Sequence, residues 1–142
     1  MRRRALRFLR LAVASPASAW LLTRMLAWRF SFMVLKRVLP LKTVVRLAEP
    51  RRRRATVDSA EQERVEFLAS RLVRTDDCLE RSLVAYRFLS RAGARPQLFL
   101  GFARDSARRE GHAWVEVESR PLLESRATLD RFVPVAQFPS PQ

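Results

Sequence analysis

The segment that decides the fold is residues 112–118, His-Ala-Trp-Val-Glu-Val-Glu, in which polar or aromatic residues alternate with small apolar ones. A period of two is typical of a β-strand, because successive side chains point to opposite faces of a sheet. The alanine and the two valines form the expected core face. The other face carries His112, Trp114 and Glu116. We expect it to form the floor of a site, with Trp114 and Glu116 contacting substrate.

The rest of residues 55–138 predicts two helices followed by further strands. The apolar spacing predicts one helix over residues 59–73, capped by Ser59, and a second over residues 77–91, which Gly93 ends. Short apolar runs predict three more strands: residues 97–102, 121–123 and 132–135. Helices followed by antiparallel strands make an α+β domain. The tail, residues 139–142, is expected to be frayed.

Residues 1–54 form a basic segment ahead of this domain. They hold 15 of the 28 Lys and Arg residues and a single acid, so they carry the whole net charge of +14. Helical periodicity predicts three helices, over residues 2–14, 17–37 and 41–48. The central one has a stripe of apolar residues at helical spacing: Leu21, Met25, Trp28, Phe32 and Leu35. We interpret residues 1–54 as a basic helical arm or subdomain and residues 55–138 as the core domain.

Several functions are open for this arm. Arg7 and Arg10 interrupt the apolar run that a secretory signal needs, and Arg24 and Arg29 interrupt the best candidate for a membrane-spanning helix. The favoured alternative is a helical subdomain packed on the core, and a second is a helix lying on an anionic membrane or a partner. The charge alone would allow nucleic-acid binding, but no recognition motif supports it, so no nucleic-acid partner is expected. A single cysteine fits a reducing compartment, and we expect a cytoplasmic protein with peripheral membrane contact left open.

The only cysteine and the only histidine, Cys78 and His112, are the candidates for chemistry. Cys78 lies at an expected helix start, where unpaired backbone N–H groups and the helix dipole favour a thiolate. Asp76 and Asp77 precede it, and we expect one of them to be the N-cap. A lone cysteine is commonly a core residue and a lone histidine commonly structural. It is the combination that points to nucleophilic catalysis by a thiolate with an imidazole as base.

A third side chain is needed to orient the imidazole of His112. A hairpin that turns near Glu118 would place Glu124 opposite His112, which makes Glu124 the candidate acceptor. Asp130 is the second candidate. One cysteine and one histidine exclude Cys-rich and multi-histidine metal sites, so we expect no metal. The glycines are too far apart for a phosphate-binding loop, so we expect no cofactor.

Four segments, in this order, resemble the lasso-peptide maturation proteases, which are transglutaminase-like cysteine peptidases that process microcin-type precursors. The segments are Asp77-Cys78-Leu79-Glu80-Arg81-Ser82-Leu83, Arg91-Ala92-Gly93-Ala94, Leu98-Phe99-Leu100-Gly101-Phe102 and Gly111-His112-Ala113-Trp114-Val115-Glu116-Val117. The resemblance covers about residues 60–137. It implies a transglutaminase-like or papain-like core, with the cysteine at a helix start and the histidine on an antiparallel sheet.

The resemblance also implies an activity. In this family a Cys-His-Asp triad removes the leader peptide from a ribosomally made precursor, so Cys78 would be the nucleophile and His112 the base and then the acid. Glu124 stands where the family usually has Asp. The implied partners are the precursor peptide and a separate cyclase, which is the component that uses ATP. Some members carry a fused leader-recognition domain. Because residues 1–54 do not read as one, we expect a separate leader-recognition protein.

Two other functions stay open on the sequence alone. One is a transglutaminase-like amidase that acts on another substrate with the same three side chains. The other is a non-catalytic basic module that binds a membrane or nucleic acid. Loss of function on substitution of Cys78 would separate the two enzymes from the module, and assays with precursor would separate the peptidase from the amidase.

Overall fold

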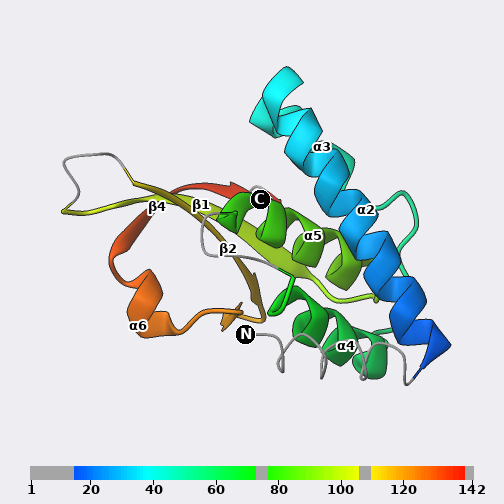
Figure 1. Cartoon of the computed structure of the whole chain (residues 1–142). Coiled ribbons are helices and arrows are strands. Elements are labelled where there is room, and N and C mark those ends of the chain that lie inside the picture. Colours follow the sequence, from blue (N-terminus) through cyan, green and yellow to red (C-terminus); the bar gives the residue numbers. More distant parts are fainter. Residues whose placement is uncertain (1–14, 73–76, 106–109, 140–142) are drawn as a thin grey trace, which may run out of the picture.

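Helix α5 (Cys78–Arg91) lies between three other helices and a sheet (Figure 1). The computed structural model describes residues 15–72, 77–105 and 110–139. Helices α2 (Pro16–Val38), α3 (Leu41–Ala48) and α4 (Ser59–Ala69) contact α5 on one side. Strands β1 (Pro96–Ala103) and β2 (Gly111–Val117) contact it on the other. These layers confirm the predicted α+β class.

The sheet has four antiparallel strands in the order β3-β2-β1-β4. Strand β3 (Arg120–Leu122) is joined to β2 by a hairpin, and β4 (Phe132–Phe138) pairs with β1. The face of β2 that carries Val115 and Val117 packs against the helices, as its period of two predicted. Between β3 and β4 lies a short helix that the sequence did not predict, α6 (Arg126–Leu129).

The arm packs on the core domain. Leu21, Met25 and Phe32 of α2 are buried in the same hydrophobic cluster as α5 and the sheet, together with residues of α3. The stripe predicted from helical spacing is therefore the inner face of α2. The boundary predicted at residue 54 does not separate two hydrophobic cores, because the cluster contains residues from both sides of it.

The outer face of α2 is also apolar. It exposes five large hydrophobic side chains: Trp20, Leu26, Phe30, Val34 and Val38. Three of the four cationic residues of α2 point instead at α5: Arg24 lies over Phe88, Arg29 pairs with Asp77, and Lys36 pairs with Glu80. None of the helices in the described part of the chain is both long enough and apolar enough to cross a membrane.

Three expected features differ from the structure or lie outside it. The N-cap of α4 is Asp58, whose carboxylate accepts a hydrogen bond from the backbone N–H of Glu61, and not Ser59. The same helix ends at Ala69, where the Ser70 hydroxyl donates to the Phe67 carbonyl oxygen and competes with the helical pattern. The predicted helix over residues 2–14 and most of the predicted frayed tail lie outside the described residues.

Gly93 ends α5, as predicted, by adopting a left-handed conformation with φ of 90°. The N–H of Ala94 then bonds to the Leu89 carbonyl, and the N–H of Gly93 bonds to the Ser90 carbonyl. This arrangement satisfies carbonyls that the helix end leaves open. A Cβ at residue 93 would also lie 2.4 Å from the Thr56 carbonyl oxygen, so this position excludes a side chain.

We predict that Gly93→Ala lowers the free energy of unfolding by at least about 1–2 kcal/mol, which is the usual cost of a left-handed alanine. The clash with Thr56 would add to this cost. Thermal or urea unfolding measures the change. Gly111→Ala is the matched control, because a Cβ there meets nothing closer than 3.6 Å. Equal stability of the two variants would contradict the prediction.

Candidate active site

Cys78 is the first residue of α5 and is half-buried. Among the causes that lower the pKa of its thiol is a hydrogen bond with the backbone of Ala113 on β2. Asp77 occupies the N-cap position, but its side chain makes no capping hydrogen bond. One of the two aspartates therefore takes the expected N-cap position, but without the hydrogen bond that a capping side chain makes; Asp76 lies outside the described residues. The Asp77 carboxylate instead accepts a hydrogen bond from Arg29 Nη2 at 2.7 Å, so α2 supplies the charge that offsets it.

The structure brings His112 to Cys78. A hydrogen bond between the two side chains is the largest cause of a lowered pKa of the Cys78 thiol. The same hydrogen bond, followed by that to Glu124, raises the pKa of His112 from 6.5 to about 9. Both directions favour a thiolate beside an imidazolium. This is the charge distribution that a cysteine nucleophile with an imidazole acid needs.

Glu124 lies on the other side of the imidazole. His112 Nε2 donates a hydrogen bond to Glu124 Oε2 at 2.6 Å. Because a carboxylate only accepts, this contact places a proton on Nε2 and leaves Nδ1 as the ring nitrogen for Cys78. Sequence reasoning predicted this pair of residues, and the structure brings them together. Asp130, the second candidate, is exposed at the C-cap of α6.

The register that leads to this contact differs from the predicted one. Val117 pairs with Arg120, so the turn is only two residues long. If this pairing continued along the strands, Ser125 and not Glu124 would lie opposite His112. Strand β3 stops before that point. Leu123 then adopts a left-handed conformation with φ of 68°. This bend, and not strand pairing, brings the carboxylate to the imidazole.

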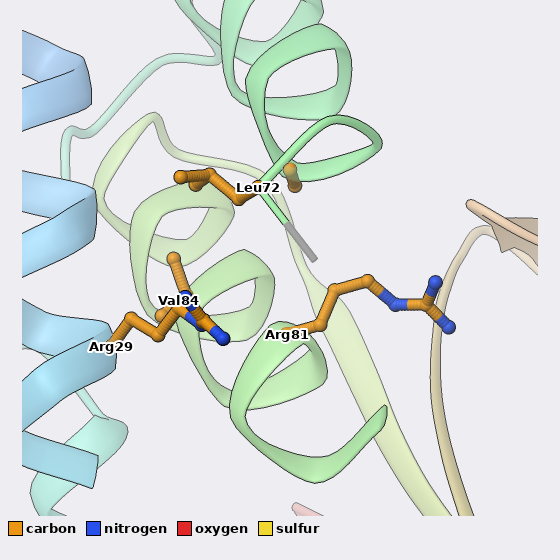
Figure 2. A pocket seen from close by; sticks show the side chains of 5 residues that line it. Arg29, Leu72, Arg81 and Val84 are labelled. Carbon is orange, nitrogen blue, oxygen red and sulfur yellow. The ribbon is translucent and has the colours of Figure 1, made fainter. Parts of the chain in front are cut away.

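Arg81 is a site residue that sequence reasoning did not identify. It lies one helical turn after Cys78, and its Nη2 pairs with Glu124 Oε1. Figure 2 shows its side chain leaving α5 on the side away from Arg29. The gap lined by both arginines has no room for a water molecule, and Arg81 Nε is buried without a hydrogen-bond partner among the described residues. The spacing of three from Cys78 was a signal for a shared helix face, but only the fold reveals the partner 43 residues away.

Trp114 and Glu116, the expected substrate contacts, are 5% and 7% exposed and point into the protein. Trp114 Nε1 donates to Glu116 Oε1 at 3.1 Å, and Arg126 Nη1 donates to the same oxygen at 2.9 Å. The face of β2 that carries them is covered by α6 and packs with Phe132, so it does not form the open floor of a site. Trp114 and Phe132 stack on the His112 ring, with centroids 6.2 and 4.5 Å away. These two rings pack against the imidazole of His112 and restrict its orientation.

A pocket of about 440 Å³ opens beside Cys78 and His112. Apart from these two side chains its wall is formed by apolar residues and glycine: Leu41, Leu79, Leu100, Gly101, Phe102, Gly111, Ala113, Val135 and Ala136. Leu41 comes from the start of α3, so the arm contributes to the site. Within the described segments, acidic, histidine and cysteine side chains form no cluster of three or more suited to a metal ion.

We predict that Glu124→Gln lowers the pKa of His112 from its value of about 9. The physical reason is the loss of a carboxylate that stabilises the imidazolium. His112 is the only histidine, so NMR titration of its imidazole signals measures this pKa directly. In a peptide-cleavage assay the rate should fall as pH rises through the pKa of the proton donor. The alkaline limb of the pH–rate profile should therefore lie at lower pH for Glu124→Gln than for the wild-type chain.

Asp130→Asn is the matched control for this experiment. It removes an exposed carboxylate from the same connection between β3 and β4 and should leave the titration of His112 in place. If Asp130→Asn lowered the pKa of His112 and Glu124→Gln did not, the assignment of Glu124 as the orienting residue would be wrong.

A comparison with models of protein families matches residues 10–137 to the transglutaminase-like superfamily. Neither a search of curated proteins nor a search of solved structures found a match to the chain. The family match begins within the arm and ends in β4, as does the hydrophobic core.

Proposed function

Because the chain belongs to the transglutaminase-like superfamily, which includes cysteine peptidases, we propose that it is a cysteine endopeptidase that removes the leader from a lasso-peptide precursor. The observation that carries the catalytic part is the hydrogen-bonded series of Cys78 at the start of α5, His112 on β2 and Glu124 between β3 and α6. The resemblance of the segments around Cys78 and His112 to lasso-peptide maturation proteases supports the choice of substrate.

Acylation would begin with attack of the Cys78 thiolate on the scissile carbonyl carbon of the precursor. The carbonyl π electrons move to oxygen, and the backbone N–H groups at the start of α5, including that of Cys78, would stabilise the oxyanion. The oxyanion collapses and expels the amine of the core peptide. His112 gives this amine a proton, and the core peptide leaves with a free N-terminus.

In deacylation the same imidazole acts as a base instead of an acid. Neutral His112 accepts a proton from water, and the resulting hydroxide attacks the thioester carbon. The leader leaves with a new carboxylate, and Cys78 returns as a thiolate beside a protonated His112. Throughout, Glu124 would hold Nε2 of the ring, and Arg81 would hold Glu124.

The proposal includes partners. The new amine of the core peptide suits a separate ATP-dependent cyclase that joins it to a side-chain carboxylate, as the resemblance implies. This chain would itself need no cofactor for hydrolysis, since thiolate, imidazole and carboxylate supply the nucleophile, the acid–base group and the orienting group. A separate leader-recognition protein would deliver the precursor.

We predict that Cys78→Ala reduces leader removal to background, because no other thiol exists in the chain. The side chain loses one sulfur at a half-buried position, so the fold should persist. Mass spectrometry of the precursor after incubation measures cleavage, and circular dichroism checks folding. Normal cleavage by the folded variant would refute the peptidase proposal. Hydrolysis of unrelated amides by the wild-type chain, with no cleavage of the precursor, would favour the amidase.

We predict that the isolated chain cleaves precursor slowly and that a leader-recognition protein raises kcat/KM by at least about tenfold, or about 1.4 kcal/mol. A bound partner raises the local concentration of the leader at the site. The apolar stripe of α2 that includes Trp28 and Phe32 packs in the hydrophobic core, so we propose that the partner docks on the exposed apolar face of α2.

Phe30→Ser should reduce the stimulation by the partner, and Phe67→Ser on α4 is its control, since Phe67 is also exposed but lies on a different helix. Cleavage rates with and without partner, in low and high salt, measure the effect. Full activity of the isolated chain would refute the need for a partner.

A further inference from the structure

The pocket beside Cys78 and His112 has an apolar wall drawn from four elements: Leu41 of α3, Leu79 of α5, Phe102 of β1 and Val135 of β4. Apart from Cys78 and His112, no side chain with a full charge lines it among the described residues. The contrast with the rest of the molecule is large, because 30% of the residues of the chain are charged and the net charge is +14.

Three of these four wall residues are exposed although they are hydrophobic. Leu41 is 38% exposed, Phe102 44% and Val135 60%. Apolar side chains gathered in a concave surface next to a nucleophile are typical of a ligand site, since a ligand that covers them removes apolar surface from water. Away from Cys78 and His112, a carboxylate or an ammonium group in this pocket would lose its hydration against an apolar wall that offers no ionic partner.

We propose that this pocket binds an apolar side chain of the peptide substrate next to the scissile bond, and that Leu41 and Val135 determine this specificity. The inference rests on the proposed function for its substrate, a peptide. It gives α3 a role in the site, because Leu41 is the first residue of that helix and stands beside the pocket that holds the nucleophile.

Alkylation of Cys78 tests the pocket without any peptide. The probes are iodoacetamide and N-benzyl-iodoacetamide, and in both cases the thiolate displaces iodide as the carbon–sulfur bond forms. Because Cys78 is the only cysteine, mass spectrometry of the intact chain measures both rates. The ratio of the benzyl rate to the iodoacetamide rate should exceed the same ratio for glutathione by at least about tenfold, which is the lower range for filling a hydrophobic pocket.

Leu41→Asn and Val135→Thr should each reduce this ratio by at least about threefold, because each places a polar atom in the wall. Leu47→Asn is the matched control. It makes the same change on the same helix at a similar exposure, 43% against 38%, and Leu47 does not line the pocket. A ratio equal to that of glutathione, or an equal loss in Leu47→Asn, would overturn the proposal.

Precursors that carry either leucine or glutamate on each side of the cleavage site form the second test. Wild-type chain should prefer leucine at one of these positions by at least about tenfold in kcat/KM, and Leu41→Asn should narrow the preference. If no precursor is cleaved while the benzyl preference persists, the pocket stands and the proposed function fails. If all precursors are cleaved equally and the benzyl preference is absent, the proposed function stands and the pocket fails.

Discussion

The burial of α5 is the constraint on which the rest of the structure depends. Nine of its 14 residues are buried, among them the charged Glu80 and the polar Ser82. A buried charge without a partner is costly, so the neighbours of α5 have to supply partners. Lys36 of α2 pairs with Glu80, and the Ser82 hydroxyl donates to the Ala113 carbonyl oxygen of β2 at 2.9 Å. The second contact joins the helix that carries the nucleophile to the strand that carries the imidazole, one residue from His112.

Helix α2 supplies partners of this kind in addition to its buried apolar stripe. Three of its four cations point at α5, and a large part of its apolar surface points outward. Arg29 and Lys36 pair with Asp77 and Glu80, the two described acidic residues nearest in sequence to Cys78. Left unpaired, these carboxylates would raise the pKa of the thiol through like-charge repulsion. Part of the positive charge of the arm is therefore used inside the molecule, where it offsets negative charge beside the thiolate.

Much of the fold could be predicted from the local periodicity of apolar residues, and the catalytic pair from the presence of only one cysteine and one histidine in the chain. The spacing of apolar residues predicted α2, α3, α5 and all four strands, because these elements each present one face to the core. A single Cys and a single His left one possible pair. What the sequence could not reveal depends on contacts between distant segments. The role of Arg81 depends on its partner Glu124, and the period of β2 cannot show that α6 covers the second face of the strand. The left-handed conformation at Leu123 could not be predicted either, because residue 123 is not a glycine.

The same turn explains how a glutamate can take the position where the peptidases that the sequence resembles usually have aspartate. Glu124 lies between the bend at Leu123 and Ser125, whose hydroxyl caps α6 by accepting a hydrogen bond from the Thr128 N–H. The backbone is therefore constrained on both sides. From this position the two carboxylate oxygens divide their contacts, Oε1 to Arg81 on α5 and Oε2 to His112 on β2. An aspartate would withdraw both oxygens by one carbon–carbon bond, about 1.5 Å, so on this backbone both contacts would lengthen. The longer side chain compensates for a hairpin whose ladder ends before it reaches the imidazole.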